Sequence, residues 1–191
     1  VSKQFTTMAL MVLAEDGKLD FDDPMTRFLP ELDNFPGVTI RHLMTHTAGL
    51  PDYYDSIDTS DGMPVNADLV AVLAQSKPVF APGERYEYSN PAYEMLALIV
   101  EKASGMACAL IRDHTEPEIA NRVLGYAPTE TGFALNDEDP LNHIVGSGGM
   151  YATLEDFLFW EEALNENAVV SRETLRQAFT RHVLNDGSET D

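Results

Sequence analysis

Apolar positions recur at intervals of three and four residues along much of the chain, the spacing that places them on one face of an α-helix. The segments that show it are separated by Gly, Pro, Asn, Asp and Thr, which are residues that begin or end helices. The pattern predicts helices at residues 2–15, 22–28, 39–47, 66–75, 90–105, 154–164 and 171–180.

The first segment is apolar on nearly all sides, so we expect a central helix rather than a surface one. Its apolar run, residues 8–14, follows Lys3 and superficially resembles a signal peptide. Glu15 and Asp16 stand where a cleavage site would need small residues, so a buried helix stopped by Gly17 is the better interpretation. Nowhere does an apolar stretch reach the roughly 20 residues that cross a bilayer.

Residues with known positional preferences define several of the expected helix ends. Asp23 is expected to cap residues 22–28, with Pro24 in the first helical position. Asn90 is expected to cap the helix at residues 90–105, with Pro91 in its first position, and Gly105 to end it.

Strand patterns are scarce. Residues 85–88 are expected to be extended, and periodicity is weak from 109 to 145. The sequence Gly146-Ser147-Gly148-Gly149 predicts a tight loop, followed by a helix that Thr153 caps. A domain with this many buried helices usually packs on a sheet, and the sequence supplies little of one.

The composition narrows the class of protein and its partners. The chain has 191 residues, 44% of them hydrophobic, which suits a single folded domain. Asp and Glu number 32 against 12 Lys and Arg, a net charge of −20 that argues against nucleic acid or an anionic membrane surface. The charge fits a cationic or small neutral ligand, or adaptation to high salt. The single cysteine, Cys108, excludes an internal disulfide and a site of several cysteines.

Two local patterns suggest a catalytic site. Lys3 lies at the start of the buried helix, where a cation is disfavoured unless it has a partner. An ordinary solvated lysine is the alternative. Tyr88-Ser89-Asn90 lies directly before another helix, and by itself it is equally well explained as a helix cap beside a packed tyrosine.

Two further patterns are more readily structural. His42 and His46 have a metal-ligand spacing, but Leu43 stands where a zinc protease would have glutamate. A pair of hydrogen-bonded histidines is the preferred interpretation, and a metal site the alternative. The loop at Gly146–Gly149 has the glycines of an anion cradle, yet it follows no clear strand, so a tight turn is favoured.

Taken together, the strings resemble the β-lactamase-related serine hydrolases, which include class C β-lactamases, D-Ala-D-Ala carboxypeptidases and esterases. The resemblance covers nearly the whole chain, and the histidine-containing segment is its most specific part. It is carried by these strings, in this order: Lys3-Gln4-Phe5-Thr6, Gly17-Lys18-Leu19-Asp20, Thr39-Ile40-Arg41-His42-Leu43-Met44-Thr45-His46-Thr47-Ala48-Gly49-Leu50-Pro51, Tyr88-Ser89-Asn90, and Gly148-Gly149-Met150-Tyr151-Ala152-Thr153.

The resemblance implies roles for three residues. Lys3 matches the lysine of the family's Ser-x-x-Lys motif, and Tyr88 and Asn90 match its Tyr-x-Asn motif. Lys3 and Tyr88 would then be catalytic, moving the proton of a nucleophilic serine, while Asn90 would bind substrate and hold Lys3. No metal or cofactor is implied. Tyr53, Tyr54 and Tyr151 are candidate walls of the substrate pocket.

The sequence also departs from the family pattern. The nucleophilic serine would stand one position before Val1, because Ser2 is out of register with Lys3. The third family motif, Lys/His-x-Gly, has no match up to Asp191, and a helix's worth of residues is expected to be deleted after Ser104-Gly105. The chain is therefore interpreted as a single domain, residues 1–191, truncated at both ends.

The expected fold class is α+β, β-lactamase and penicillin-binding-protein-like, mostly the helical part with the antiparallel sheet largely missing. We expect the first helix to show an exposed apolar face as a result. The expected function is hydrolysis of a β-lactam, a D-amino acid peptide or a small ester through an acyl-enzyme. A non-catalytic relative that serves as a binding module is the alternative. Members of the family are often exported, which slightly favours export here.

Overall fold

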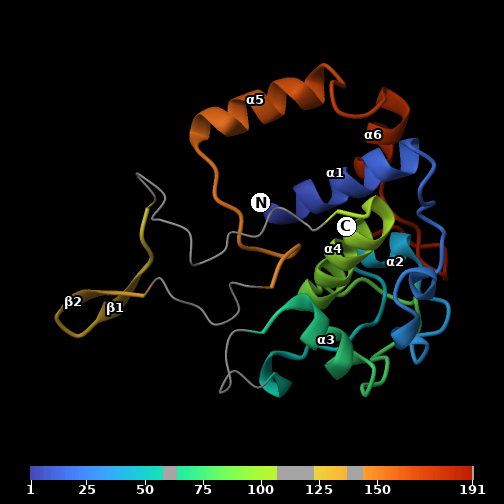
Figure 1. Cartoon of the computed structure of the whole chain (residues 1–191), viewed down its shortest axis with the longest axis horizontal. Helices are drawn as coiled ribbons and strands as arrows, with labels where there is room; N and C mark the ends of the chain where they lie inside the picture. The colour runs from blue at the N-terminus through green and yellow to red at the C-terminus, as the bar shows by residue number, and fades with distance from the viewer. Residues whose placement is uncertain (58–63, 107–122, 137–143, 191) are drawn as a thin grey trace.

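The computed structural model describes residues 1–57, 64–106, 123–136 and 144–190, and its described part is mostly helical (Figure 1). The helices and strands follow in this order: α1 (Ser2–Glu15), the 3₁₀ turns η1 (Met25–Arg27) and η2 (Pro30–Leu32), α2 (Ile40–Met44), η3 (Tyr54–Ser56), α3 (Asn66–Leu73), α4 (Asn90–Ser104), β1 (Tyr126–Thr129), β2 (Gly132–Leu135), α5 (Leu154–Asn165) and α6 (Arg172–Ala178).

Helix α4 is the centre of the molecule and packs against α1, α2 and α3 (Figure 1). Met95, Leu96 and Ile99 on α4 are fully buried. On α1, Leu10 is fully buried and Met11 is 1% exposed. Burying each such side chain contributes about 1.5–3 kcal/mol, so the α1–α4 contact is a main source of stability. The expectation of a central first helix is confirmed.

The N-cap of α4 lies one residue earlier than expected. Ser89 is the N-cap residue, and its hydroxyl accepts a hydrogen bond from the amide of Ala92, while Asn90 is the first helical residue. The expected cap at Asn90 is therefore wrong, and this frees the Asn90 side chain for another contact. At the other end Gly105 ends the helix in the left-handed conformation, as predicted, with φ 73°.

The expected helix at residues 22–28 is wrong, because only one 3₁₀ turn, Met25–Arg27, forms there. Pro24 is extended and pairs with Thr39 in an isolated antiparallel bridge, and the Met25 amide donates to the carbonyl of Val38. These contacts to a distant segment replace the bonds that a helix would make. The Asp23 carboxylate accepts from the Asp20 amide and pairs with Arg27 instead of capping a helix.

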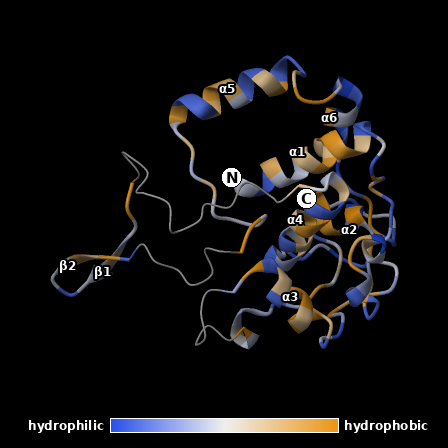
Figure 2. Ribbon diagram, viewed as in Figure 1, coloured by the Kyte–Doolittle hydropathy of each residue, from blue (hydrophilic) through white to orange (hydrophobic). Residues whose placement is uncertain are grey.

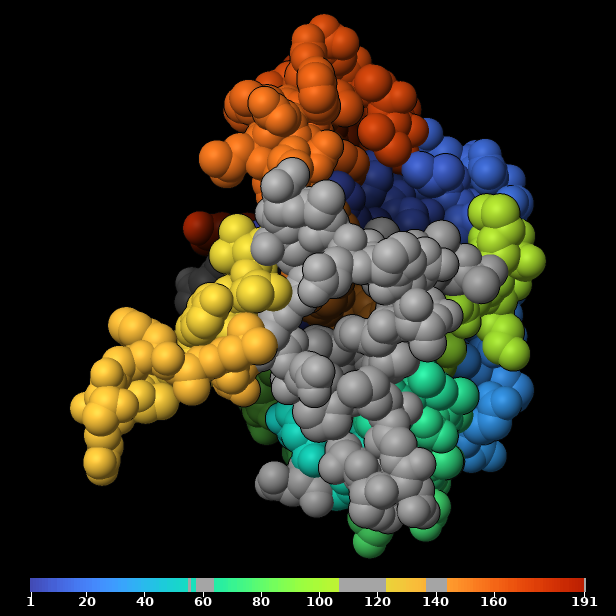
Figure 3. All heavy atoms as spheres, turned by 60° about the vertical axis from the view of Figure 1, so that its left-hand side comes forward, coloured from blue at the N-terminus to red at the C-terminus, as the bar shows by residue number. Residues whose placement is uncertain are grey.

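A small antiparallel sheet of two strands lies in the stretch where periodicity was weak. Strands β1 and β2 form a hairpin in which Tyr126 faces Leu135 and Thr129 faces Gly132. The hairpin projects from the helical body (Figure 3). Its strands show no burial on alternate positions, and Phe133 is 77% exposed, so the alternation that reveals a half-buried strand is missing. Residues 85–88, expected to be extended, form no strand. The expected deletion after Gly105 borders residues 107–122, outside the described ranges, as is Cys108.

The exposed apolar surface lies on α5, not on α1 as expected. Six α1 residues are buried, whereas Leu154, Leu158 and Phe159 on α5 are each more than 60% exposed. Figure 2 shows apolar and polar residues alternating around α5, which lies apart from α4. The correction has a simple cause: α4 and the segments around it cover the face of α1 that was expected to be bare.

Candidate active site

Lys3 is held by two hydrogen bonds at the start of α1. Its ammonium donates to the side-chain oxygen of Asn90 at 2.6 Å and to the backbone carbonyl of Ser147 at 2.9 Å. The side chain is half-buried between α1, α4 and the loop at residues 145–149. Lys3 is therefore not the ordinary solvated lysine that was the alternative.

Two tyrosine rings lie around the same ammonium. The Nζ atom of Lys3 is 4.8 Å from the ring centroid of Tyr88 and 5.4 Å from that of Tyr93, distances at which a cation is attracted to an aromatic face. Lys3, Tyr88 and Asn90, which the sequence singled out, are thus together. Tyr88 meets the lysine through its ring, and it is 58% exposed.

Tyr93 is a residue that the sequence reasoning missed at this site. It lies one turn after Asn90 on α4, its hydroxyl donates to the Met44 carbonyl at 2.9 Å, and it also bonds the Thr7 hydroxyl at 3.1 Å. Burial raises its pKa. The three-residue spacing from Asn90, which places both on one helix face, was the available signal.

The loop at residues 145–149 is held tightly against α4. Asn66 makes three hydrogen bonds that join the loop to α4, one with the Glu94 carbonyl and two with the backbone of Val145. Thr6 donates to the carbonyl of Gly146 at 2.8 Å. Gly146 has φ 101°, and a Cβ atom there would lie 2.3 Å from the Tyr93 carbonyl oxygen. The chain bends at residues 146–148.

A buried carboxyl group, Glu94, lies behind the loop. It is 1% exposed, accepts a hydrogen bond from the Ser147 hydroxyl at 2.7 Å, and contacts the hydroxyls of Tyr53 and Tyr54. Burial raises the pKa of Glu94, while its hydrogen bonds from the three hydroxyls and the charge of Lys3 act in the opposite direction. Nothing in the local sequence marked this glutamate, because all its side-chain partners are at least 40 positions away.

His46 is a neutral side chain beside the same tyrosines. Its Nδ1 accepts a hydrogen bond from the Ser89 amide at 3.1 Å, and its ring lies 4.6 Å from the ring of Tyr88 and 5.1 Å from that of Tyr93, between centroids. Burial and the charge of Lys3 lower the pKa of His46 to about 4. The residue also has φ 58°, which is uncommon outside glycine.

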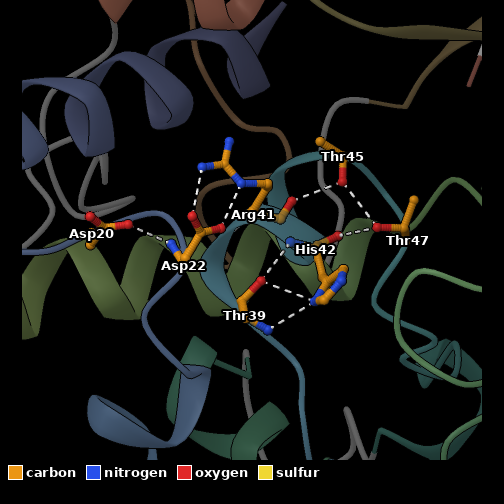
Figure 4. Close-up of polar contacts among 7 residues, drawn as sticks. All are labelled: Asp20, Asp22, Thr39, Arg41, His42, Thr45 and Thr47. Atoms are coloured by element: carbon orange, nitrogen blue, oxygen red, sulfur yellow. Dashed lines mark hydrogen bonds and ion pairs between the residues drawn. The ribbon is translucent and has the colours of Figure 1, made fainter. Parts of the chain in front are cut away.

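His42 faces a different group of residues (Figure 4). Its Nδ1 bonds the amide and hydroxyl of Thr39, in the cap of α2, and burial lowers its pKa. Beside it Arg41 pairs through two nitrogens with Asp22, which lowers the pKa of that carboxyl group. Each histidine has its own hydrogen-bond partner, as the preferred interpretation predicted, and no cluster of three metal-ligating residues occurs in the described ranges.

Residues 1–189 match the family model described as Beta-lactamase. The chain belongs to this family. Among curated relatives, penicillin-binding protein 4* of Bacillus subtilis is 34% identical over the full chain, and the esterase EstB of Burkholderia gladioli is 29% identical over the full chain. The chain spans 49% and 62% of these two relatives' lengths. The alignment with the first runs over 224 positions, so that relative has segments which this chain lacks.

Solved structures show the same β-lactamase-family fold. A penicillin-binding protein of Bacillus halodurans matches with a TM-score of 0.79 and 32% identity, over 95% of this chain and 63% of that one. A D-amino acid amidase of Ochrobactrum anthropi matches with a TM-score of 0.76 and 25% identity, over 91% of this chain and 56% of that one. The expected fold class, a penicillin-binding-protein-like fold represented mostly by helices, is confirmed.

The three tyrosines expected to line the substrate pocket, Tyr53, Tyr54 and Tyr151, differ in how far they are exposed. Tyr53 is 1% exposed, so it cannot line a substrate pocket, and burial together with Glu94 raises its pKa. Tyr54 is half-buried, and the same two causes raise its pKa to about 12. Tyr151 is exposed and borders a cavity of about 360 Å³ beside Phe5 and Trp160.

A cavity lies beside α1, and Tyr93 of the candidate site is among the residues that line it. It measures about 380 Å³ and is lined by residues of α1, α2, α5 and α6, among them Met8, Met44 and Trp160. Lys3, Tyr88 and Asn90 do not line it.

Within the described ranges, no helix has the length and apolar character needed to cross a membrane.

Proposed function

We propose that the protein carrying this chain is a serine hydrolase that works through an acyl-enzyme. The observation that carries the proposal is the position of Lys3, whose ammonium is bonded to Asn90 and lies against the ring of Tyr88. Membership of the Beta-lactamase family supports it, as do relatives named as a penicillin-binding protein, an esterase and a D-amino acid amidase.

In the proposed mechanism, the nucleophile is a serine directly before Val1, one helical turn ahead of Lys3. Residues three apart share a helix face, so its hydroxyl would lie beside the lysine. An ammonium has three donors, and in the described part of the chain Asn90 and Ser147 take up two of them. The third N–H donor of Lys3 is then directed to the serine or to Tyr88.

The reaction has two steps that conserve protons. Serine Oγ attacks the substrate carbonyl carbon while its proton passes to the Lys3–Tyr88 pair, and the same proton is given to the leaving nitrogen or oxygen as the scissile bond breaks. Water then attacks the acyl-serine ester, and the serine recovers its proton. Asn90 keeps the lysine in place and offers its amide nitrogen to the substrate carbonyl.

The proposed substrates are small acyl compounds: a β-lactam, a peptide of D-amino acids or a small ester. The net charge of −20 supports a neutral or cationic substrate and no role for nucleic acid. The proposal requires no cofactor.

The test uses the longer protein with the residues that naturally precede Val1. We expect it to be labelled by a fluorescent penicillin or a fluorophosphonate and to hydrolyse nitrocefin or p-nitrophenyl acetate. Lys3→Ala should lower the acylation rate by at least about 10²-fold, the scale of one proton-transfer group. Lys18→Ala, at an exposed lysine, is the matched control. A folded longer protein that neither labels nor hydrolyses would instead support the non-catalytic binding module.

A further inference from the structure

Ser147 makes two contacts that join a buried carboxyl group to the candidate catalytic lysine. Its hydroxyl donates to Glu94 at 2.7 Å, and its backbone carbonyl accepts from the Lys3 ammonium at 2.9 Å. Ser147 therefore links the buried Glu94 to Lys3. An anchor on the Ser147 hydroxyl therefore also restrains the residue whose carbonyl accepts from Lys3.

In the described part of the chain, the hydrogen bonds of the Glu94 carboxyl group are with the hydroxyls of Tyr53, Tyr54 and Ser147, and the proposed mechanism gives Glu94 no role. A carboxyl group that is 1% exposed is costly to bury, and it is retained here with hydroxyl partners from two separate segments. Tyr53 and Tyr54 fix it from the side of η3. It lies one turn after Asn90 on α4, so the two side chains project from the same face of the helix toward the loop and Lys3.

We propose that Glu94 is a positioning residue for Lys3 and acts through Ser147. The carboxyl group anchors the Ser147 hydroxyl, and this orients the Ser147 carbonyl toward the ammonium. Asn90 then meets the lysine from one side and Ser147 from the other, so the ammonium is held at a defined point beside Tyr88. Glu94 itself touches neither Lys3 nor the reacting atoms.

Other anchors of the loop do not replace this contact. Asn66 and Thr6 hold Val145 and Gly146 through backbone atoms, and the Ser147 amide follows them by one residue. Gly148 follows Ser147 with no atom within 4 Å of where its Cβ would lie, and glycine leaves the backbone more rotational freedom than any other residue. The Ser147 peptide therefore depends on its own side chain for its orientation.

The first test needs no enzymatic activity and uses the 191-residue chain. Proton exchange of the Lys3 ammonium, followed by ¹H–¹⁵N NMR at mildly acidic pH, reports how firmly its hydrogen bonds are held. Ser147→Ala removes the hydroxyl and leaves the carbonyl, and Glu94→Ala removes the anchor. Each should raise the exchange rate by about tenfold, the size expected when one charge-assisted hydrogen bond is weakened.

Conservative variants separate positioning from general support of the fold. Ser147→Thr keeps a hydroxyl and should restore slow exchange, and Glu94→Gln keeps one acceptor oxygen and should give an intermediate rate. Glu101→Gln makes the same chemical change on α4 about two turns further along and should match the wild type. Circular dichroism and urea unfolding check that each variant is folded, and Ser147→Ala decides the question if Glu94→Ala does not fold.

If Ser147→Ala is folded and its Lys3 ammonium exchanges no faster than in the wild type, the proposal is overturned. It is also overturned if Ser147→Thr exchanges as fast as Ser147→Ala. A kinetic arm in the longer protein rests on the proposed function: Ser147→Ala should lower kcat for acylation with little change in KM. The two failures are distinct. A wild type that never acylates, but in which Ser147→Ala frees Lys3, defeats the proposed function alone, whereas normal acylation with unchanged exchange defeats this inference alone.

Discussion

At the scale of single residues, the site combines groups whose individual conformations or charges are unfavourable. His46 adopts a left-handed backbone conformation and keeps its ring neutral beside a lysine. Glu94 is buried away from water. Such costs persist where surrounding contacts over-determine the residue, and here the contacts converge on Lys3 and the two tyrosines.

His46 gives a prediction for acid stability. The unfolded chain binds a proton at this residue below a pKa of 6.5, whereas the folded chain does so only near 4. The stability that neutral His46 contributes is therefore present above pH 6.5 and is lost as the pH falls toward 4, by at most about 3 kcal/mol. Protonation would also end its bond from the Ser89 amide and bring a cation toward Lys3.

We expect His46→Asn to flatten this part of the pH profile, because asparagine tolerates the left-handed conformation and does not titrate. Urea unfolding of both proteins between pH 7 and pH 4 measures the difference. His42→Asn gives the comparison at the other histidine of the motif, where burial also lowers the pKa and some flattening is expected as well. Parallel pH profiles for wild type and His46→Asn would contradict the prediction.

The sequence singled out Lys3, Tyr88 and Asn90, which the structure brings together, but not the residues that surround them. The first three belong to short strings that a family resemblance exposes. Glu94 and Ser147 form a pair across 53 positions, and the glycine pattern around Ser147 gave no sign of a bond to Glu94. Such a pair depends on how α4 meets the loop, which single-sequence periodicity does not describe.

At the scale of elements, periodicity and helix caps predicted the helices α1 to α6 of the described part, including the short α2 and α6 and the exposed α5. The 3₁₀ turn at residues 25–27 and the hairpin were not predicted. Helix α1 ends at Glu15 and α4 ends before Gly105, as the sequence indicated. The segment at residues 22–28 became a 3₁₀ turn because a bridge to Thr39 competed with helical bonds. The hairpin was missed because its strands bury neither face.

The loop before α5 yields a prediction at this scale. Gly146→Ala should destabilise the protein by about 2–4 kcal/mol, because the new Cβ would press on the Tyr93 carbonyl at 2.3 Å and on Ala97 at 2.8 Å, with φ at 101°. Gly148→Ala is the matched control, since its Cβ would meet nothing within 4 Å. Urea unfolding compares the two, and equal stabilities would show that the close approach of the loop to α4 is not as described.

At the scale of the whole molecule, a dense helical core coexists with strong surface charge and with apolar side chains outside the core. The core joins residues from α1, α2, α3, α4 and α6. The chain spans 49% of its Bacillus subtilis relative, and the sheet of its described part is one hairpin. A helical domain of this kind usually packs on a large sheet, but this sequence has few alternating strand patterns from which one could be predicted.

The net charge of −20 predicts a dependence of stability on salt. Repulsion among acidic side chains opposes the compact state, and the screening length falls from about 30 Å at 0.01 M to about 3 Å at 1 M salt. We expect Tm to rise with KCl over this range, and NaCl to act alike. Sucrose, which does not screen charge, is the control. The highest Tm at the lowest salt would refute both this prediction and the adaptation to salt considered from the sequence.

The apolar side chains of α5 predict dye binding. Leu154, Leu158 and Phe159 are all largely exposed, so we expect the 191-residue chain to bind ANS at neutral pH. Leu158→Glu together with Phe159→Lys should reduce the fluorescence without lowering stability, because neither side chain is in the core. Val65→Glu, at a separate exposed apolar residue, serves as the control. Absence of dye uptake in the wild type would contradict the exposure of this helix face.

The two hydrogen bonds of Lys3 span 87 and 144 positions of the chain. Contacts so distant in sequence carry a large loop-closure entropy and form late in folding. During synthesis the lysine leaves the ribosome long before Ser147, and at about 5–20 residues per second the interval lasts many seconds. The amine is therefore unconfined on the nascent polypeptide until Ser147 has been translated and has reached it.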